Sequence, residues 1–160
     1  MTVFYYPSPL GRICLAREGG ALVGLWFEGQ RYYRLGCEDA PEGDADPIAV
    51  RWLDAYFSNR ALPEPPKLLP RGTAFQKRVW SALLTVPYGT TVSYGELASR
   101  LDCRSARAVG AAVGRNPISL MIPCHRVIGS NGTLTGYAGE IWRKKALLEL
   151  ERNGKDSFPE

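Results

Sequence analysis

The chain has 160 residues, of which 45% are apolar, with a formal net charge of +4 and a pI near 9.0. This length suits one large or two small domains, and no apolar run approaches the ~20 residues of a membrane span. The start, Met1 to Tyr6, lacks the basic flank and cleavage site of a signal peptide. We therefore expect a cytoplasmic protein that does not enter a membrane.

The four cysteines and the single histidine limit which metal sites this chain could form. Cys14, Cys37, Cys103 and Cys124 show no CxxC spacing, and one histidine makes a zinc site hard to assemble. We expect free thiols in a reducing compartment, no metal and no other cofactor. The positive charge permits a polyanionic partner without requiring one.

Residues 1–60 are predicted to form a small domain, an antiparallel sheet with one helix. Three runs rich in β-branched and aromatic residues are separated by turn sequences, and these runs are Thr2–Tyr6, Arg12–Arg17 and Ala21–Phe27. Asp46 and Pro47 supply an N-cap and a first-turn proline for a helix that ends near Ser58 and covers one face of the sheet. Nothing in this part has catalytic spacing, and Cys14 and Cys37 are interpreted as packing residues, so we expect a scaffold.

Residues 61–72 are rich in proline and can be neither helix nor central strand, so we interpret them as a semi-rigid linker. The linker separates an acidic segment at 38–46 from a basic stretch at 71–115. We place the domain boundary here, with a second domain at 73–153 and a tail at 154–160. The basic second domain is the expected partner face.

The second domain is predicted to be mainly helical. Three N-cap residues mark helix starts, and they are Thr73, Ser93 and Ser105. Ser93 with Glu96 forms a capping box for a helix over Tyr94–Leu101, and a short turn leads to another over Ala106 to about Arg115. This spacing is that of a helix-turn-helix, and equally that of an ordinary pair of antiparallel helices.

The second of these helices is built mostly of alanine and glycine around Arg107. A helix that reads the major groove usually offers long polar side chains. Each glycine costs about 1 kcal/mol against alanine, so the composition indicates that something approaches closely. If that is DNA, a thin helix with one arginine fits a minor groove roughly 6 Å wide. The alternative is a helix packed tightly on its neighbour through small buried residues.

Cys124 follows a proline and precedes the only histidine, His125. Ile122 comes before Pro123, whose φ is fixed, so we expect a stiff, extended backbone that suits a positioned nucleophile. Neighbouring side chains on an extended segment point to opposite sides, so His125 would reach the sulfur only through a water. Taken alone, Cys124 could also be a small core residue.

Three motifs carry a specific resemblance: Pro123-Cys124-His125-Arg126-Val127, the preceding Arg107-Ala-Val-Gly with Asn116-Pro117, and the following Gly136-Tyr137. Together they resemble the methylated-DNA-protein-cysteine methyltransferases, which repair DNA by direct reversal. The match covers about Phe75 to Glu151, whereas the first domain resembles that of the family only in general pattern. The resemblance implies an α/β two-domain protein and a suicide reaction, in which Cys124 takes the alkyl group from oxygen-6 of guanine, or oxygen-4 of thymine, in duplex DNA.

The resemblance also implies the roles of the catalytic residues. His125 would act as a base for Cys124 through a water, and Glu151 would orient His125. Spacing from Tyr137 selects Glu151 in a helix predicted over Ile141–Arg152, although Glu149 is close by. Asn116 would bond the backbone and hold the Asn-Pro bend.

At the DNA, the resemblance implies base flipping through the minor groove. Arg107 would fill the vacated stack, Tyr94 would crowd the target phosphate, and Tyr137, held by Gly136 and Gly139, would stack on the flipped base. The remaining residues implied at the DNA or the lesion are Ala106, Ala108, Gly110, Val127 and Ser130. Glu140 stands where many members have a small residue, which leaves the range of alkyl groups open.

Other classes of protein remain as alternatives. A lesion-binding relative without an acceptor would carry another residue in place of Cys124. A helix-turn-helix regulator would need polar base-reading residues and a dimerisation helix, neither of which is seen, so we expect a monomer on double-stranded DNA. A cysteine protease would need its Cys and His on separate elements.

Overall fold

The N-terminal half forms the predicted antiparallel meander. The computed structural model describes the chain except residues 135–136, 138–139 and 158–160 and the side chains of 155–157. The sheet has the order β1-β2-β3, with β1 (Thr2–Ser8), β2 (Gly11–Glu18) and β3 (Ala21–Phe27). Gly11 closes the first turn at φ 116°, a conformation that favours glycine.

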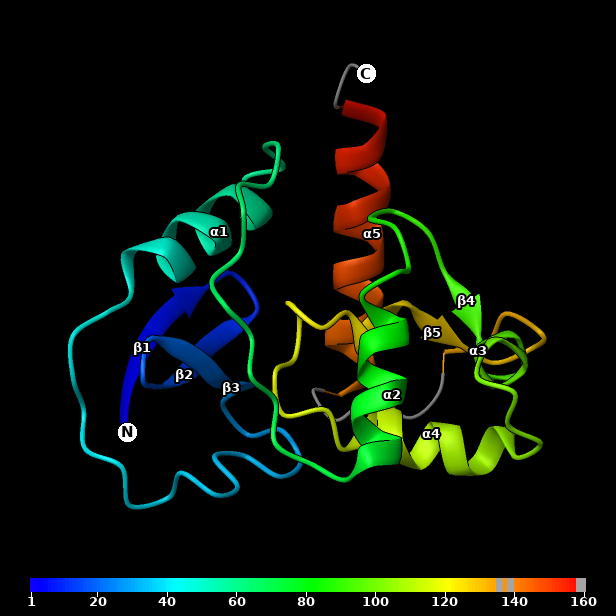
Figure 1. Ribbon diagram of the computed structural model, residues 1–160. Coiled ribbons are helices and arrows are strands. Elements are labelled where there is room, and N and C mark those ends of the chain that lie inside the picture. The colour runs from blue at the N-terminus through cyan, green and yellow to red at the C-terminus, as the bar shows by residue number, and fades with distance from the viewer. Residues whose placement is uncertain (135–136, 138–139, 158–160) are drawn as a thin grey trace.

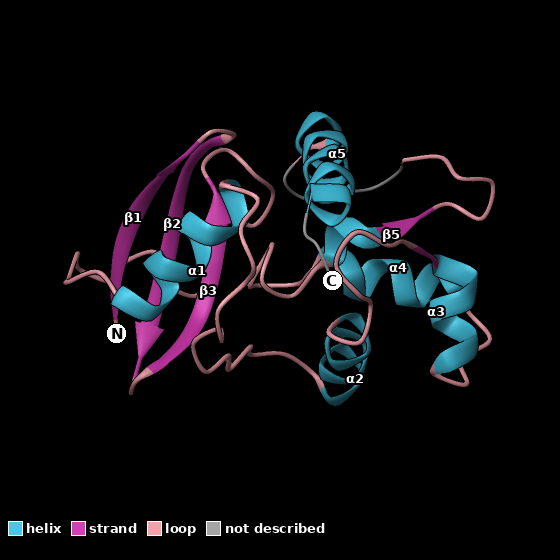
Figure 2. Ribbon diagram, turned by 90° about the horizontal axis from the view of Figure 1, so that it is seen from above, coloured by secondary structure: helices cyan, strands magenta, loops and turns pink. Residues whose placement is uncertain are grey.

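Helix α1 (Pro47–Phe57) covers one face of this sheet (Figure 2). The side chain of Asp46 accepts a hydrogen bond from the N–H of Ile48 at 3.0 Å, and proline takes the first helical position, where no donor is needed. The other face of the sheet packs in a smaller apolar cluster that contains Cys14 and Cys37. The sheet is therefore buried on both sides.

The C-terminal half is mainly helical (Figure 1). Its elements are α2 (Ala74–Leu83), β4 (Val92–Ser93), α3 (Tyr94–Arg100), α4 (Ala106–Gly114), the 3₁₀ turn η1 (Cys124–Arg126), β5 (Val127–Ile128) and α5 (Ile141–Ser157). The predicted N-caps all form, with full capping boxes at Thr73 and Ser93 and a side-chain cap at Ser105. The short strands β4 and β5 pair in parallel. The local helix signals in this half are thus confirmed.

Helix α5 stands between α1 on one side and α3 and α4 on the other (Figure 1). It has 17 residues and continues past Arg152, where we expected it to end, so residues 154–157 are helical. Gly154 permits this continuation, because a side chain there would collide with the Tyr88 hydroxyl. Within the described part of the chain, no helix is long and apolar enough to cross a membrane.

The free edge of β3 ties the two halves together. Leu68 of the predicted linker forms a parallel bridge with Leu22. Ile118 forms a second bridge with Leu25, whose N–H donates to the carbonyl of Pro117 at 2.9 Å. One hydrophobic core also runs from the sheet and α1 into α2–α5. The segment that leads to Cys124 is therefore attached to the N-terminal sheet.

Trp80 connects α2 to α4 inside this core. Its side chain is 2% exposed, and its indole N–H donates to the carbonyl of Ala112 at 2.8 Å. We predict that Trp80→Phe lowers the free energy of unfolding by about 1–3 kcal/mol, because the hydrogen bond and part of the packing are lost. Urea denaturation followed by circular dichroism measures this change.

Trp142→Phe is the matched control, since Trp142 is 51% exposed and its described partners, Glu140 and Arg143, are close to it in sequence. It should stay within about 0.5 kcal/mol of the unsubstituted protein, as is usual for surface changes. Equal decreases in the free energy of unfolding of the two variants would contradict the assignment of Trp80 as a stabilising contact between α2 and α4.

Candidate active site

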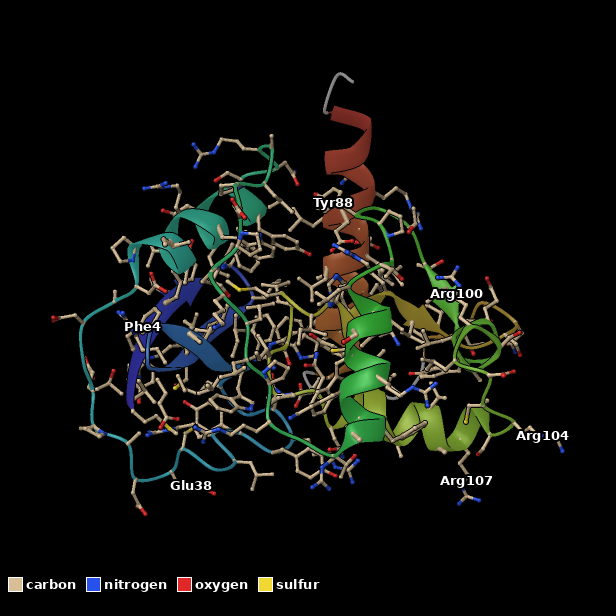
Figure 3. The ribbon with its side chains drawn as sticks, in the orientation of Figure 1. Phe4, Glu38, Tyr88, Arg100, Arg104 and Arg107 are labelled. Atoms are coloured by element: carbon tan, nitrogen blue, oxygen red, sulfur yellow. The ribbon has the colours of Figure 1, made fainter. Side chains whose placement is uncertain are left out.

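Helix α4 presents small residues outward. Its core side consists of Val109, Ala112 and Val113, whereas its exposed residues include Ala106, Arg107, Ala108 and Ala111. Arg107 points away from the body of the protein, as does Arg104 before the helix (Figure 3). Although Ala112 is buried, most of the small side chains lie on the open face. The exposed face of α4 is therefore thin, with Arg107 projecting from it.

Tyr94 lies behind this face, at the start of α3. Gly110 of α4 packs on it, since a Cβ at Gly110 would lie 3.6 Å from the Tyr94 ring. This is an ordinary contact distance, so the glycine reflects close packing of the helix pair rather than strain. The structure thus brings Tyr94 and Gly110 together, next to the outward face of α4.

The segment between α4 and Cys124 is held by the buried side chain of Asn116. Its Nδ2 donates to the carbonyls of Ile122 at 2.8 Å and Ile118 at 3.4 Å. Its Oδ1 accepts from the N–H of Ile118 at 3.0 Å. Within this bend Leu120 has φ 74°, a left-handed conformation that costs a side-chain-bearing residue about 1–3 kcal/mol. The side chain of Asn116 therefore stabilises a strained backbone bend.

Cys124 opens the turn η1, so the expectation that Cys124 and His125 lie on an extended segment is wrong. Pro123 has φ −80° and ψ 66°, and the N–H of Arg126 donates to the carbonyl of Pro123 at 3.1 Å. Proline restricts only its own φ and the residue before it, and the Asn116 bend decides the rest. The side chain that hydrogen-bonds Cys124 is Asn116.

The Cys124 thiol is kept protonated at rest. Burial raises its pKa, although the hydrogen bond from Asn116 and the charge of Lys144 act in the opposite direction. The side chain is only 4% exposed. Because a thiolate and not a thiol is the reactive nucleophile, any reaction at this sulfur would need a base.

Glu151 of α5 contacts both residues that follow the cysteine, His125 and Arg126. Its Oε2 lies 2.5 Å from Nε2 of His125. Arg126 donates from Nε to Oε1 at 2.8 Å and from Nη2 to Oε2 at 3.1 Å. Glu149, the other candidate in this helix, is exposed. The structure therefore brings Glu151 to His125.

The contacts of His125 show which of its two ring nitrogens carries the proton. Although burial alone would raise the pKa of Glu151, His125 and Arg126 hold that pKa well below its usual range. The ionised carboxylate can only accept, so Nε2 of His125 donates. Burial lowers the pKa of His125, which keeps the ring neutral near pH 7, and its buried Nδ1 bonds no described residue. His125 thus offers an unprotonated nitrogen.

The other predicted lesion residues lie on several segments. Tyr137 is 9% exposed, and a hollow of about 360 Å³ is lined by Tyr137 together with Arg31, Tyr32, Gly110, Ala111, Gly114 and Arg115. Val127 is buried in β5, and Ser130 is exposed in the turn that follows. Gly136 and Gly139, predicted to hold Tyr137, lie outside the described residues. Glu140 is exposed and accepts from the Trp142 indole at 2.6 Å.

Three residues of the site were missed in the sequence. Arg126 stands next to His125 and could have been inferred from that position. Lys144 is fully buried in α5, 5.9 Å from the Tyr94 ring, and burial lowers its pKa to about 8. Tyr56 bonds Glu151 from 95 residues away. No local sequence pattern marks the last two.

Comparisons with known proteins cover both halves of the chain. Residues 74–153 match the family model of the 6-O-methylguanine DNA methyltransferase DNA-binding domain, and residues 1–64 match that of its ribonuclease-like domain. The methylated-DNA–protein-cysteine methyltransferase of Mycobacterium tuberculosis H37Rv is 49% identical over 147 residues, which cover 91% of this chain and 89% of the relative. Its counterpart in Methanosarcina acetivorans is 41% identical over 161 residues, covering 91% and 95%.

A solved structure agrees with these relatives. The crystal structure of Mycobacterium tuberculosis OGT in complex with DNA matches this fold with a TM-score of 0.89 and 46% identity, covering 96% of this chain and 94% of that chain. The likeness therefore includes the N-terminal half, whose sequence had resembled the family only in general pattern.

We predict that Glu151→Gln lowers the free energy of unfolding by about 3–5 kcal/mol near neutral pH, because it leaves Arg126 buried without its counter-charge. Folding lowers the pKa of Glu151. Its contribution is thus complete above the unfolded pKa of ~4.3 and is lost as pH falls through that value towards the folded pKa. In urea titrations, the unsubstituted protein should lose stability below about pH 4.3 more steeply than the variant.

Glu149→Gln serves as the control, because Glu149 is exposed on the same helix. It should follow the curve of the unsubstituted protein. If Glu151→Gln ran parallel to that curve over the same pH range, the lowered pKa assigned to Glu151 would be wrong.

Proposed function

This chain belongs to the 6-O-methylguanine DNA methyltransferase family, and we propose that it moves the methyl group from oxygen-6 of guanine in duplex DNA to Cys124. The family consists of DNA repair alkyltransferases. One observation supports the proposal most directly: beside the buried Cys124, a neutral His125 has Nε2 bound to ionised Glu151 and Nδ1 open to accept a proton. This arrangement can activate a thiol that burial keeps protonated.

The chemical steps follow from these positions. His125 takes the thiol proton of Cys124 through a bridging water, and Glu151 stabilises the charge that the ring acquires. A sulfur lone pair then attacks the methyl carbon, so that an S–C bond forms while the C–O6 bond breaks and its electrons pass to guanine. Guanine takes up a proton at N1, which balances the proton lost by the thiol. The same displacement applies to oxygen-4 of thymine.

The duplex is proposed to meet the outward face of α4. Ala106 and Ala108 are exposed there and permit close approach of the minor groove, with Gly110 beneath. Cys124 is almost fully buried, so a base in the stack cannot reach it and must be flipped. Arg107, which projects from this face (Figure 3), would fill the vacated stack.

The flipped base is proposed to enter beside Tyr137. This ring is buried next to the hollow along α4 and can stack on the base. Val127 and Ser130 would border the base from the β5 side, and Tyr94 would crowd the target phosphate. In support, the solved relative with a TM-score of 0.89 is described in complex with DNA.

Intact mass and product counting test the reaction. With excess methylated duplex, the protein should gain the mass of one methyl group, and repaired guanine should plateau at one equivalent. The reason is that water does not displace the alkyl sulfide formed on Cys124 under mild conditions. Peptide mapping should place the methyl group on Cys124. Continued product formation beyond one equivalent would contradict single turnover.

Two substitutions serve as controls for this assay. Cys124→Ser should abolish the mass gain and keep duplex binding, because the DNA contacts are assigned to α4 and Tyr94. Cys103→Ser should react normally, since Cys103 lies in the turn between α3 and α4. Methylation of Cys14, Cys37 or Cys103 in the unsubstituted protein would contradict the assigned acceptor.

Arg107→Ala should slow reaction with duplex lesions by about tenfold or more, since the unstacking cost of a few kcal/mol is then less well offset. Reaction with free alkylguanine should change little, because no stack is vacated. Rates on the two substrates, compared with Arg104→Ala as an exposed neighbour, measure the effect. Equal slowing on both substrates would rule out the proposed role.

A further inference from the structure

Tyr56, on the last turn of α1, reaches from the N-terminal half to the carboxylate of the candidate site. Its side chain is fully buried, and its hydroxyl donates to Oε2 of Glu151 at 2.6 Å. The same oxygen lies 2.5 Å from Nε2 of His125. One carboxylate oxygen is therefore shared by a tyrosine of the first domain and the histidine of the second.

The phenol of Tyr56 acts as a donor in this contact. Burial, followed by the charge of Glu151 and the hydrogen bond to it, raises the pKa of Tyr56 well above its ordinary value, so the hydroxyl keeps its proton. The ring stacks on Trp52 with centroids 5.2 Å apart and meets Tyr88 edge-on at 6.1 Å. Removing only the hydroxyl would leave these ring contacts in place.

Docking of the sheet on α5 fixes where this hydroxyl lies. Arg143, near the start of α5, donates from Nε to the carbonyl of Leu10 at 2.9 Å and from Nη2 to that of Glu28 at 3.2 Å. Leu10 lies in the β1–β2 turn, and Glu28 directly follows β3. Arg143 and Glu151 are about two helical turns apart. The N-terminal half thus contacts α5 at two places along the helix, at Arg143 and at Glu151.

We propose that Tyr56 is a positioning residue of the transfer reaction, which holds Glu151 in place and draws negative charge away from the oxygen that faces His125. This inference rests on the proposed function. Tyr56 does not touch the reacting atoms and acts through Glu151. The first domain would then contribute to the chemistry as well as to the scaffold.

The direction of the effect follows from the groups around His125. Burial disfavours its protonated form, Glu151 favours that form, and Arg126 and Lys144 oppose it. The other titratable groups near His125 and Glu151 among the described residues include the thiol of Cys124 and the phenols of Tyr56, Tyr88 and Tyr137. A phenol bonded to Oε2 weakens the pull of that oxygen on the imidazole proton. Loss of the hydroxyl should therefore raise the pKa of His125.

The experiment compares Tyr56→Phe with Tyr6→Phe in the full chain. Tyr6 is a matched control, because its hydroxyl also donates to a carboxylate at 2.6 Å, that of Asp54 on α1, but away from Glu151. The chain has a single histidine, so NMR of its imidazole reports His125 without assignment. The rate of methyl transfer is measured against pH in parallel.

In Tyr56→Phe, the midpoint of the His125 titration and the acid limb of the rate profile should both move up by about one pH unit. The transfer rate at neutral pH should fall about tenfold, the usual size for one charge-assisted hydrogen bond. Tyr6→Phe should change neither, and duplex affinity should be the same in both variants. An unmoved His125 midpoint in folded Tyr56→Phe would overturn the inference.

A second variant keeps the test decisive if Tyr56→Phe folds poorly. Fluorotyrosine placed at position 56 preserves the ring and makes the phenol a stronger donor, so the His125 midpoint should fall instead of rising. No shift would overturn the inference. If the unsubstituted protein transferred no methyl group, the proposed function would fail, while the NMR midpoints would still show whether Tyr56 acts on His125.

Discussion

A buried negative charge on Glu151 organises the centre of this protein. A carboxylate removed from water must be surrounded by donors, and this one receives them from separate parts of the chain. These four donor residues stand on only three segments: the Tyr56 hydroxyl on α1, the Gly89 N–H before β4, and the side chains of His125 and Arg126 in η1. Each donor lowers the cost of burying the charge, and each is held in place by it. Stability and the orientation of His125 therefore depend on the same group.

Although the sequence divides into two parts at the proline-rich segment, the two parts pack together closely. The edge of β3 is covered by Leu68 from the linker and by Ile118 from the segment that leads to Cys124. A single apolar core passes from the sheet into α2–α5. Because Ile118 of this bridge lies within the bend that Asn116 holds, only a few residues separate the sheet edge from the cysteine.

Patterns among neighbouring residues predicted the secondary structure. They could not predict contacts between residues that are far apart in the sequence. The caps at Asp46, Thr73 and Ser93 depend on neighbouring residues, and they form as expected. The turn at Cys124 was missed because the extended preference acts on the residue before a proline, whereas Cys124 follows one. The grouping of Cys124 with His125 and Glu151 came from resemblance to a family. No periodicity could have revealed that Tyr56 meets a carboxylate 95 positions later.

The order of these residues along the chain has a consequence for protein synthesis. The ribosome makes Cys124 and His125 well before Glu151, which lies 26 residues after the histidine, on the final helix. Until α5 emerges and docks, the nascent chain has its thiol but no partner that orients the imidazole, and the core that shields the sulfur is incomplete. A chain that stalls during translation would therefore carry the cysteine without the carboxylate that is proposed to assist its reaction.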